Sequence, residues 1–304
     1  MSSPAYTIVR SLGVGALSEA LLVRTDDGRH VVLKRLHRHL CHDATFAEMF
    51  AHEARALAAL SHPGVAGLAE VRGLDPTREF AQAFAPGLSL DVAMASLRGP
   101  MPHGAACEAI AQLLGALEHV HTRRASDGAA LCLVHRDVCP ANVIASREGH
   151  ITLVDFGIAT SAWRPERDRG QLKGTRGYMA PEVVTGERDP DARVDLFAVG
   201  VMLYELTVGR RLYEGAAPRV MAAIADGALP SPARDAPGYP EALDAVARRA
   251  LARHADERYA SAREMLDALD AAAAAHGIAR GREALAAVIA RCIDAQPRDL
   301  TSLG

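Results

Sequence analysis

Lysine is almost absent from this chain. Only Lys34 and Lys173 occur among its 304 residues, and all the other basic residues are arginines. The chain therefore uses arginine wherever a plain positive charge suffices. A lysine retained against this bias suggests a role for a compact ammonium group that a planar guanidinium cannot fill.

Cysteine is also scarce, and its spacing excludes two classes of protein. The cysteines are scattered in an arrangement that matches neither a zinc-ligand motif nor a disulfide framework. Such usage is typical of a reducing compartment, so the expected location is the cytoplasm. The five residues are Cys41, Cys107, Cys132, Cys139 and Cys292.

Long apolar runs and a strong net charge are missing as well. The longest apolar stretches, such as Leu196 to Leu206, are too short to span a bilayer, and this one contains Glu205. The chain starts without the basic-then-apolar pattern of a signal peptide. Its net charge of -3 provides no general attraction to nucleic acid or anionic lipid. Neither a nucleic acid nor a membrane is therefore expected as a partner.

The first 85 residues favour strands over helices. Short apolar runs at Tyr6–Val9, Ala20–Val23 and Val31–Leu33 predict strands, and Asp26–Gly28 predicts the hairpin turn between the last two. Residues 45–60 carry apolar side chains at helical spacing, which predicts one amphipathic helix in this part of the chain.

Beyond Pro86 and Gly87, which mark a predicted boundary between lobes, helical patterns dominate. Helices are predicted at Cys107–His121, Val194–Thr207, Glu241–Ala252 and Ser261–Ala275, and short strands at Leu131–Val134 and Ile151–Val154. The expected class is α+β, with a small, mainly β lobe over residues 1–85, a larger, mainly helical lobe over 86–272 and a helical tail over 273–304. The tail carries an apolar stripe (Leu285, Val288, Ile289 and Cys292), so we expect it to pack on the large lobe.

Gly13-x-Gly15-x-x-Ser18 lies between two predicted strands. Glycines let backbone N–H groups approach a phosphate closely, but a hairpin also needs glycines, so this motif alone is weak evidence. Lys34 ends a later strand, and Glu53 lies on the polar side of the predicted helix. An ammonium group held by a carboxylate suits phosphate binding, whereas the alternative is an edge-strand lysine and a solvated glutamate.

Two acids and a carboxamide each follow a predicted strand: Asp137, Asn142 and Asp155. Phosphoryl transfer needs one carboxylate to accept the proton of the attacking hydroxyl, and a second carboxylate with an amide oxygen to hold magnesium. In the alternative interpretation these residues only form turns and a helix cap. The complete pattern is His135-Arg136-Asp137-Val138-Cys139-Pro140-Ala141-Asn142, followed by Asp155-Phe156-Gly157.

This set of motifs resembles that of the eukaryotic-type serine/threonine protein kinases, and of their bacterial members in particular, over residues 6–272. The resemblance implies a bilobal kinase fold with ATP and Mg²⁺ as cofactors. It implies transfer of the γ-phosphate to serine or threonine hydroxyls of a protein substrate. It also implies autophosphorylation, with the self-association that supports it.

The resemblance further implies a role for each matching residue. Asp137 is similar to the catalytic base, Lys34 to the lysine on the α and β phosphates with Glu53 as its partner, and Asn142 and Asp155 to the magnesium ligands. The nucleotide-binding set that it implies, including the gatekeeper Gln82 and the hinge from Ala83 to Ala85, is Leu12, Gly13, Val14, Gly15, Ser18, Ala20, Val32, Lys34, Gln82, Ala83, Ala85, Ile144 and Asp155.

Three further positions resemble structural anchors of the family. Glu182, in Ala180-Pro181-Glu182, closes the activation segment, and Arg258 is similar to the arginine that pairs with it. Asp195 resembles the buried helix aspartate that anchors the catalytic loop.

Cys139 departs from the family pattern. Serine/threonine kinases usually carry lysine at this position, where it steadies the γ-phosphate, and a neutral thiol cannot supply that charge. The loss of one such contact costs about 2–4 kcal/mol of transition-state stabilisation if no other group replaces it. Lys173 is a candidate replacement, although an exposed loop lysine is the simpler interpretation.

The activation segment departs from the pattern too, because residues 162–174 contain no serine, threonine or tyrosine. The hydroxyls that remain nearby are Thr160, Ser161 and Thr175. Thr175 resembles the threonine that touches the catalytic base, which predicts a structural role. Arg136, which would normally grip a loop phosphate, is left with Glu166, Asp168 or a phosphorylated Thr160 or Ser161 as alternative partners.

Three functions remain as alternatives. The prediction is an active serine/threonine kinase. Cys139 and Ser18 favour a pseudokinase that binds nucleotide as a scaffold. The intact site residues oppose it: Lys34, Asp137, Asn142 and Asp155. A small-molecule phosphotransferase would generally lack the Ala-Pro-Glu segment and the Asp195 helix.

Overall fold

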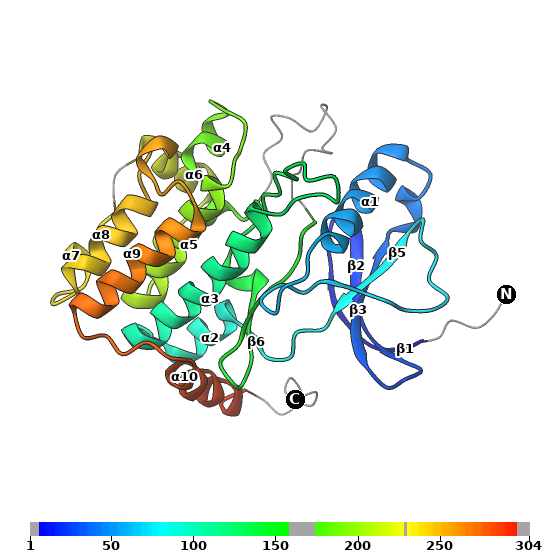
Figure 1. Cartoon of the computed structure of the whole chain (residues 1–304), viewed down its shortest axis with the longest axis horizontal. Coiled ribbons are helices and arrows are strands. Elements are labelled where there is room, and N and C mark those ends of the chain that lie inside the picture. The colour runs from blue at the N-terminus through cyan, green and yellow to red at the C-terminus, as the bar shows by residue number, and fades with distance from the viewer. Residues whose placement is uncertain (1–5, 158–173, 228–229, 297–304) are drawn as a thin grey trace.

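The computed structural model describes residues 6–157, 174–227 and 230–296. These residues form two lobes, a β-sheet lobe on the right of Figure 1 and a larger helical lobe on the left. The predicted α+β class, with a mainly β N-terminal part and a mainly helical C-terminal part, is confirmed.

The small lobe consists of one antiparallel sheet and one long helix. The strand order in the sheet is β1-β2-β3-β5-β4, so β3 pairs with β2 on one side and with β5 on the other, both antiparallel. The elements are β1 (Tyr6–Val14), β2 (Ser18–Thr25), β3 (His30–Leu36), α1 (Ala44–Ala58), β4 (Leu68–Ala69) and β5 (Glu79–Ala83).

Helix α1 packs on one face of this sheet. Asp43 caps its first turn, because the side chain accepts a hydrogen bond from the backbone N–H of Thr45 at 2.8 Å. The rings of Phe50 in α1 and Phe80 in β5 have centroids 4.8 Å apart, and Leu57 is fully buried in the same core. This packing fixes the rotation of α1 relative to β3.

The large lobe is built around α5, whose residues from Val194 to Thr207 are all buried. The apolar run from Leu196 to Leu206 is therefore the centre of this lobe, where α5 contacts α3 and α8. None of the described helices has the length and apolarity needed to cross a membrane. The helices are α2 (Leu90–Leu97), α3 (His103–His121), α4 (Pro181–Thr185), α5 (Arg193–Val208), α6 (Ala217–Asp226), α7 (Pro232–Asp235), α8 (Glu241–Ala250), α9 (Ala262–Ala275) and α10 (Arg282–Asp294).

A second, three-stranded sheet lies where the large lobe meets the small one. Its strands are β6 (Leu88–Ser89), β7 (Val143–Ala145) and β8 (Ile151–Leu153), in that order. Short 3-10 turns occur at Arg38–Leu40, Pro140–Asn142, Arg176–Tyr178 and Ala255–Glu257.

Most predicted elements match the structure, with one clear exception. The strand predicted at Leu131–Val134 is wrong, because the backbone of Cys132 takes a φ of 48° and such a left-handed residue interrupts an extended strand. The apolar stripe predicted in the tail packs as expected, since α10 contacts α2 and α3 of the large lobe.

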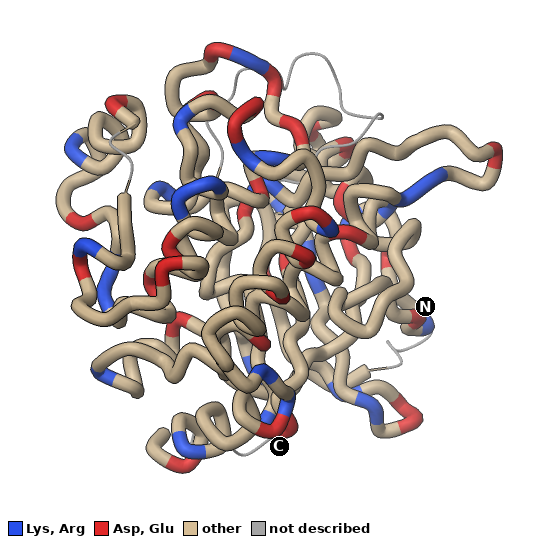
Figure 2. The backbone as a smooth tube through the Cα atoms, turned by 60° about the vertical axis from the view of Figure 1, so that its left-hand side comes forward, with Lys and Arg blue, Asp and Glu red and all other residues tan. Residues whose placement is uncertain are grey.

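Charges of both signs are interspersed over the surface. Figure 2 shows basic and acidic positions following one another along the described chain, and many of them pair locally. Arg193, for example, contacts Asp191 at 2.8 Å and Asp256 at 2.6 Å. Exposed pairs of this kind each contribute less than about 1 kcal/mol of stability, so the fold depends on its core.

The loop between α1 and β4 joins the small lobe to the large one. Ala66 donates a backbone hydrogen bond to Leu153 at 3.0 Å, and Leu153 donates to Gly64 at 2.9 Å. His62 of the loop stacks on His119 of α3 with ring centroids 5.2 Å apart. The N–H of Gly64 donates to Nδ1 of His62 at 3.0 Å, and the N–H of Ser61 donates to Nε2 of His119 at 3.3 Å.

Both rings therefore serve as hydrogen-bond acceptors, which requires each to be neutral. Burial lowers the pKa of His62. Burial lowers the pKa of His119 as well, and so do the neighbouring His62 and Arg123. Because the folded protein then binds these protons less readily than the unfolded chain, the two groups stabilise the fold above their unfolded pKa.

We expect acidification to weaken this connection. A histidine in an unfolded chain has a pKa of about 6.5, so the stabilisation is lost progressively as the pH falls below that value toward the lower folded pKa. The free energy of unfolding by urea should therefore fall more in the wild type than in a His62→Asn/His119→Gln variant, whose amide oxygens remain acceptors. An equal fall in both proteins between about pH 7 and pH 5 would contradict this assignment.

Candidate active site

A cleft of about 780 Å³ opens between the two lobes. Its walls come from the strands of the small lobe and from the segments that flank β7 and β8. Every residue predicted for the catalytic, nucleotide-binding and metal-binding sets lines this cleft: Leu12, Gly13, Val14, Gly15, Ser18, Ala20, Val32, Lys34, Glu53, Gln82, Ala83, Ala85, Asp137, Asn142, Ile144 and Asp155.

The turn between β1 and β2 forms one wall. The N–H of Gly15 donates to the carbonyl of Ser18 at 2.8 Å and closes the turn. Nε2 of His37 lies 2.9 Å from the carbonyl oxygen of Gly15, and the N–H of His37 donates to the carbonyl of Leu17 at 2.9 Å. A Cβ atom at Gly13 would meet no protein atom within 4 Å, so the fold does not require this glycine. The space that it leaves suits a ligand that approaches the backbone closely.

Lys34 lies between two carboxylates at the inner end of the cleft. Its Nζ is 2.5 Å from Oε1 of Glu53 on α1 and 2.7 Å from Oδ1 of Asp155, which follows β8. The side chains of Lys34 and Glu53 are only 8% and 7% exposed, whereas that of Asp155 is 48% exposed. The ammonium group thus ties β3, α1 and the segment after β8 together, and Asp155 still presents a carboxylate to the cleft.

The charges in this group support one another. Burial opposes the charged form of Lys34, but the neighbouring Glu53 and Asp155 outweigh it, and the pKa of the ammonium group is raised. Burial likewise opposes ionisation of Asp155, whereas the charge and hydrogen bond of Lys34 bring its pKa below the usual value. Burial and the nearby Asp155 raise the pKa of Glu53 against the opposing effect of Lys34. The half-exposed carboxylate of Asp155 is therefore the group that can accept a cation.

Asp137 lies in the same cleft and accepts hydrogen bonds on both oxygens. The N–H and Oγ1 of Thr175 each donate to its Oδ1 at 2.7 Å, and Nδ2 of Asn142 donates to its Oδ2 at 3.1 Å. Because Asn142 uses its NH₂ group in this contact, its amide oxygen is the atom left to face a cation. The N–H of Val154 binds the carbonyl of Asn142 at 2.9 Å, which places Asn142 near Asp155.

Asp195 of α5 binds the backbone of the loop that carries Asp137. The buried carboxylate accepts hydrogen bonds from the backbone N–H groups of His135 at 2.9 Å and Arg136 at 2.8 Å, and it contacts Nε2 of His121 at 2.8 Å. Burial opposes its ionisation, but these hydrogen bonds and the nearby histidines bring its pKa below the usual value. Arg136 has a φ of 68°, a left-handed conformation that costs about 1–3 kcal/mol and persists only when its surroundings hold it.

Glu182 and Arg258 form a buried ion pair next to the segment that carries Thr175. The guanidinium donates to both carboxylate oxygens, at 2.8 and 2.7 Å, and the two side chains are 6% and 0% exposed. Arg258 also donates to the carbonyl of Ala252 at 2.8 Å. Removal of one partner would leave a buried charge and cost about 3–5 kcal/mol, so this pair fixes α4 on the large lobe.

Comparisons with known proteins agree with this geometry. The model of the protein kinase domain family matches residues 6–268. The chain belongs to the protein kinase domain family. It is 33% identical to the tyrosine-protein kinase MasK of Myxococcus xanthus over 87% of this chain and 42% of that protein.

Two further relatives are named as serine/threonine-protein kinases. The chain is 32% identical to the serine/threonine-protein kinase Pkn1 of Myxococcus xanthus, over 89% of this chain and 38% of that protein. It is also 32% identical to the serine/threonine-protein kinase PknB of Mycolicibacterium smegmatis, over 86% of this chain and 42% of that protein. The chain therefore spans less than half the length of these relatives.

Cys139 lies inside this kinase domain, not on its surface. The side chain is only 2% exposed, and its Sγ is 3.6 Å from Oγ1 of Thr175. Burial, with the neighbouring Asp137, raises the pKa of the thiol to about 11. The thiol is therefore neutral near pH 7 and cannot replace the positive charge that kinases usually carry there.

The residues of the activation segment that were considered as partners of Arg136 or as a replacement charge fall outside the described residues. These are Thr160, Ser161, Glu166, Asp168 and Lys173. Thr175 is described, and its contact with Asp137 matches the structural role expected for it.

The cleft also contains residues that the sequence analysis missed. Phe84 lies inside the predicted hinge and Gly157 inside the Asp-Phe-Gly motif, although neither was named among the site residues. Gly87 is required by the fold, because it has a φ of 140° and a Cβ there would lie 2.2 Å from the carbonyl oxygen of Ala145. Gln296 carries no local signal at all. The full set is Arg10, Ala16, Leu17, Phe84, Gly87, Leu88, Ser89, Val92, Ala141, Val154, Gly157 and Gln296.

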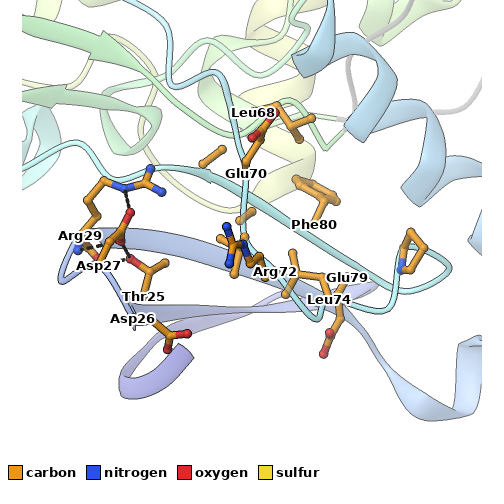
Figure 3. Close-up of a pocket in the computed structure, with 14 residues that line it drawn as sticks. Thr25, Asp26, Asp27, Arg29, Leu68, Glu70, Arg72, Leu74, Glu79 and Phe80 are labelled. Carbon is orange, nitrogen blue, oxygen red and sulfur yellow. Dashed lines mark hydrogen bonds and ion pairs between the residues drawn. The ribbon is translucent and has the colours of Figure 1, made fainter. Parts of the chain in front are cut away.

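A second cavity, of about 750 Å³, lies on the small lobe beside the turn between β2 and β3 (Figure 3). Its rim carries Asp27, whose side chain contacts Thr25 and Arg29, and its wall includes Leu74 and Phe80. It contains neither the buried lysine nor the residues of the catalytic loop. The catalytic chemistry therefore belongs to the cleft between the lobes.

We expect the burial of Cys139 to protect it from alkylation. A maleimide reacts with the thiolate, so the exposed Cys132 should be labelled first at neutral pH, while Cys139, Cys107 and Cys292 remain unlabelled. Mass spectrometry of the native protein measures the order, and in denaturant all the cysteines should react. Labelling of Cys139 as fast as Cys132 would show that this thiol is accessible.

Proposed function

We propose that this chain is a serine/threonine protein kinase domain that transfers the γ-phosphate of Mg-ATP to serine and threonine hydroxyls of proteins, itself included. Its small lobe spans residues 1–85, its large lobe 86–272 and its helical tail 273–304. The observation that carries the proposal is the assembled site, in which Lys34 pairs with Glu53 and Asp155 while Asp137 and Asn142 face the same cleft.

The lining of the cleft fits a nucleotide. Ala20 and Val32 on one side and Ile144 on the other would enclose an adenine ring, and the backbone of Ala83 and Ala85 would bind its edge. Lys34 presents its ammonium group where the phosphates follow, next to the turn of Gly13 and its neighbours. The buried pairing with Glu53 holds that group in place before any ligand arrives.

The side chains of Asp155 and Asn142 fit a magnesium ion. Asp155 supplies a half-exposed carboxylate and Asn142 an amide oxygen, and oxygen donors of these two types suit Mg²⁺. The ion would neutralise phosphate charge during transfer.

Asp137 is the proposed base. The substrate hydroxyl would donate its proton to this carboxylate as its oxygen attacks the γ-phosphorus, and the bond from that phosphorus to the β–γ bridging oxygen would break to release ADP. Thr175 and Asn142 fix the orientation of the carboxylate through hydrogen bonds to both of its oxygens. The contact of Thr175 also brings the segment from 174 to 178 close to the base, which suits the short reach of serine and threonine side chains.

The alternatives have less support. A pseudokinase was favoured by Cys139 and Ser18, yet the lysine, both acids and the carboxamide all lie in bonding geometry. A small-molecule phosphotransferase is opposed by the buried pair of Glu182 and Arg258, which closes a segment that such enzymes generally lack.

Asp137→Asn should abolish most transfer while leaving nucleotide binding. The amide keeps the shape of the side chain but cannot accept the proton, and loss of a general base typically lowers the rate by about 10²–10⁴-fold. The measurement is transfer of labelled phosphate from Mg-ATP to a generic protein substrate and to the chain itself, with phosphoamino-acid analysis of the product.

The outcomes separate the functions. Phosphoserine and phosphothreonine in the wild type alone support the proposal, and phosphotyrosine alone contradicts the choice of acceptor. Nucleotide binding without transfer in the wild type would indicate a pseudokinase. Equal transfer by both proteins would indicate a contaminating kinase.

Lys34→Arg should also lower turnover, by at least about tenfold, because a planar guanidinium does not fit the buried space between Glu53 and Asp155. The matched control is Arg35→Lys, at the next position of β3, whose side chain pairs with Glu79 instead and should tolerate the exchange. Near-normal turnover of Lys34→Arg would show that the site needs only a positive charge.

A further inference from the structure

The last helix of the chain is joined to the nucleotide cleft. Helix α10 lies beyond residue 268, where the match to the family model ends, yet it packs against α2 and α3 of the large lobe (Figure 1). Its residues Leu285, Val288, Ile289 and Cys292 are at most 3% exposed. The helix is therefore part of the core of the large lobe.

Several contacts fix where α10 ends. Arg282, the first residue of α10, lies against Gly149. A Cβ atom added to Gly149 would be 2.4 Å from the carbonyl oxygen of Arg282. Arg147 binds Asp294 at 2.8 Å, and Sγ of Cys292 lies 3.7 Å from the carbonyl of Ala93 in α2. Contacts to α2 and to the loop between β7 and β8 thus set the position of the residues that follow.

Gln296, two residues past the helix, lines the cleft. Its Nε2 donates to Oγ of Ser96 in α2 at 2.6 Å and lies 3.4 Å from the carbonyl of Cys292. The amide group is therefore held by its nitrogen. Its oxygen accepts no hydrogen bond from the residues that the structure describes and remains available to a ligand.

The neighbours of Gln296 indicate which part of a nucleotide it would meet. Among the residues that line the cleft, Val92 belongs to α2, the helix that holds this amide, and Ser89 directly precedes that helix. Ser89 pairs with Ile144, one of the residues proposed to enclose the adenine, and Lys34 marks the phosphate end. The sugar joins these two parts of the ligand, and its hydroxyl groups are the hydrogen-bond donors that a neutral amide oxygen suits.

We propose that Gln296 is a specificity-determining residue of the nucleotide site, whose Oε1 accepts a hydrogen bond from a ribose hydroxyl. This inference rests on the proposed function, because it takes the ligand of the cleft to be a ribonucleotide. It assigns to the appended helix a direct part in nucleotide selection, through a residue outside the family match.

The test compares Mg-ATP with Mg-2′-deoxy-ATP and Mg-3′-deoxy-ATP by calorimetric binding to the full chain. The wild type should prefer ATP over one deoxy analogue by about five- to tenfold, as expected for one hydrogen bond. Gln296→Ala should bind ATP more weakly by about the same factor and should lose the preference. Gln296→Glu retains an acceptor oxygen and should keep the preference even if its charge weakens the binding of both nucleotides.

The control variant is Asp294→Ala, which removes an exposed ion pair at the same end of α10 without touching the cleft and should leave the preference unchanged. An undiminished preference in Gln296→Ala would overturn the inference and leave the proposed function standing. A change confined to the KM for the protein substrate would also overturn it. No nucleotide binding by the wild type would overturn both.

Discussion

The buried ammonium group of Lys34 is the interaction on which the rest of the site depends. A buried lysine is stable only if carboxylates surround it, and here one of them comes from α1 and the other from the segment after β8. Its position therefore requires the sheet, the helix and the large lobe to take one relative arrangement. The space for the nucleotide is what remains between them.

Asp195 is a second buried charge that fixes part of the site, and it is an anion that positions the catalytic loop. It lies in α5, which is buried along nearly its whole length, and it binds two successive backbone N–H groups of the catalytic loop. The position of Asp137 thereby depends on a helix that is buried in the core of the large lobe. The buried ammonium group of Lys34 therefore positions the part of the cleft proposed to bind the nucleotide, and the buried carboxylate of Asp195 positions the loop that carries Asp137.

The sequence was sufficient for the parts of the site that local spacing determines. The spacing of Asp137, Asn142 and Asp155 matched the kinase pattern and predicted one site, although the strand expected before Asp137 does not form. Other contacts depend on packing between distant segments. Cys139 lies in the hydrophobic core and contacts Thr175, and Gln296 reaches the cleft because α10 packs on α2. The strand expected at Leu131–Val134 failed because the left-handed backbone of Cys132 has no signature in a short apolar run.

The near absence of lysine has a consequence for the behaviour of the molecule in alkaline solution. A lysine-rich surface loses positive charge as its ammonium groups approach their usual pKa of about 10.4, whereas guanidinium groups stay protonated. The described lysine is itself held between two carboxylates that raise its pKa. The cationic charge of this protein, on the surface and at the centre of the cleft, is therefore nearly independent of pH where that of most proteins declines.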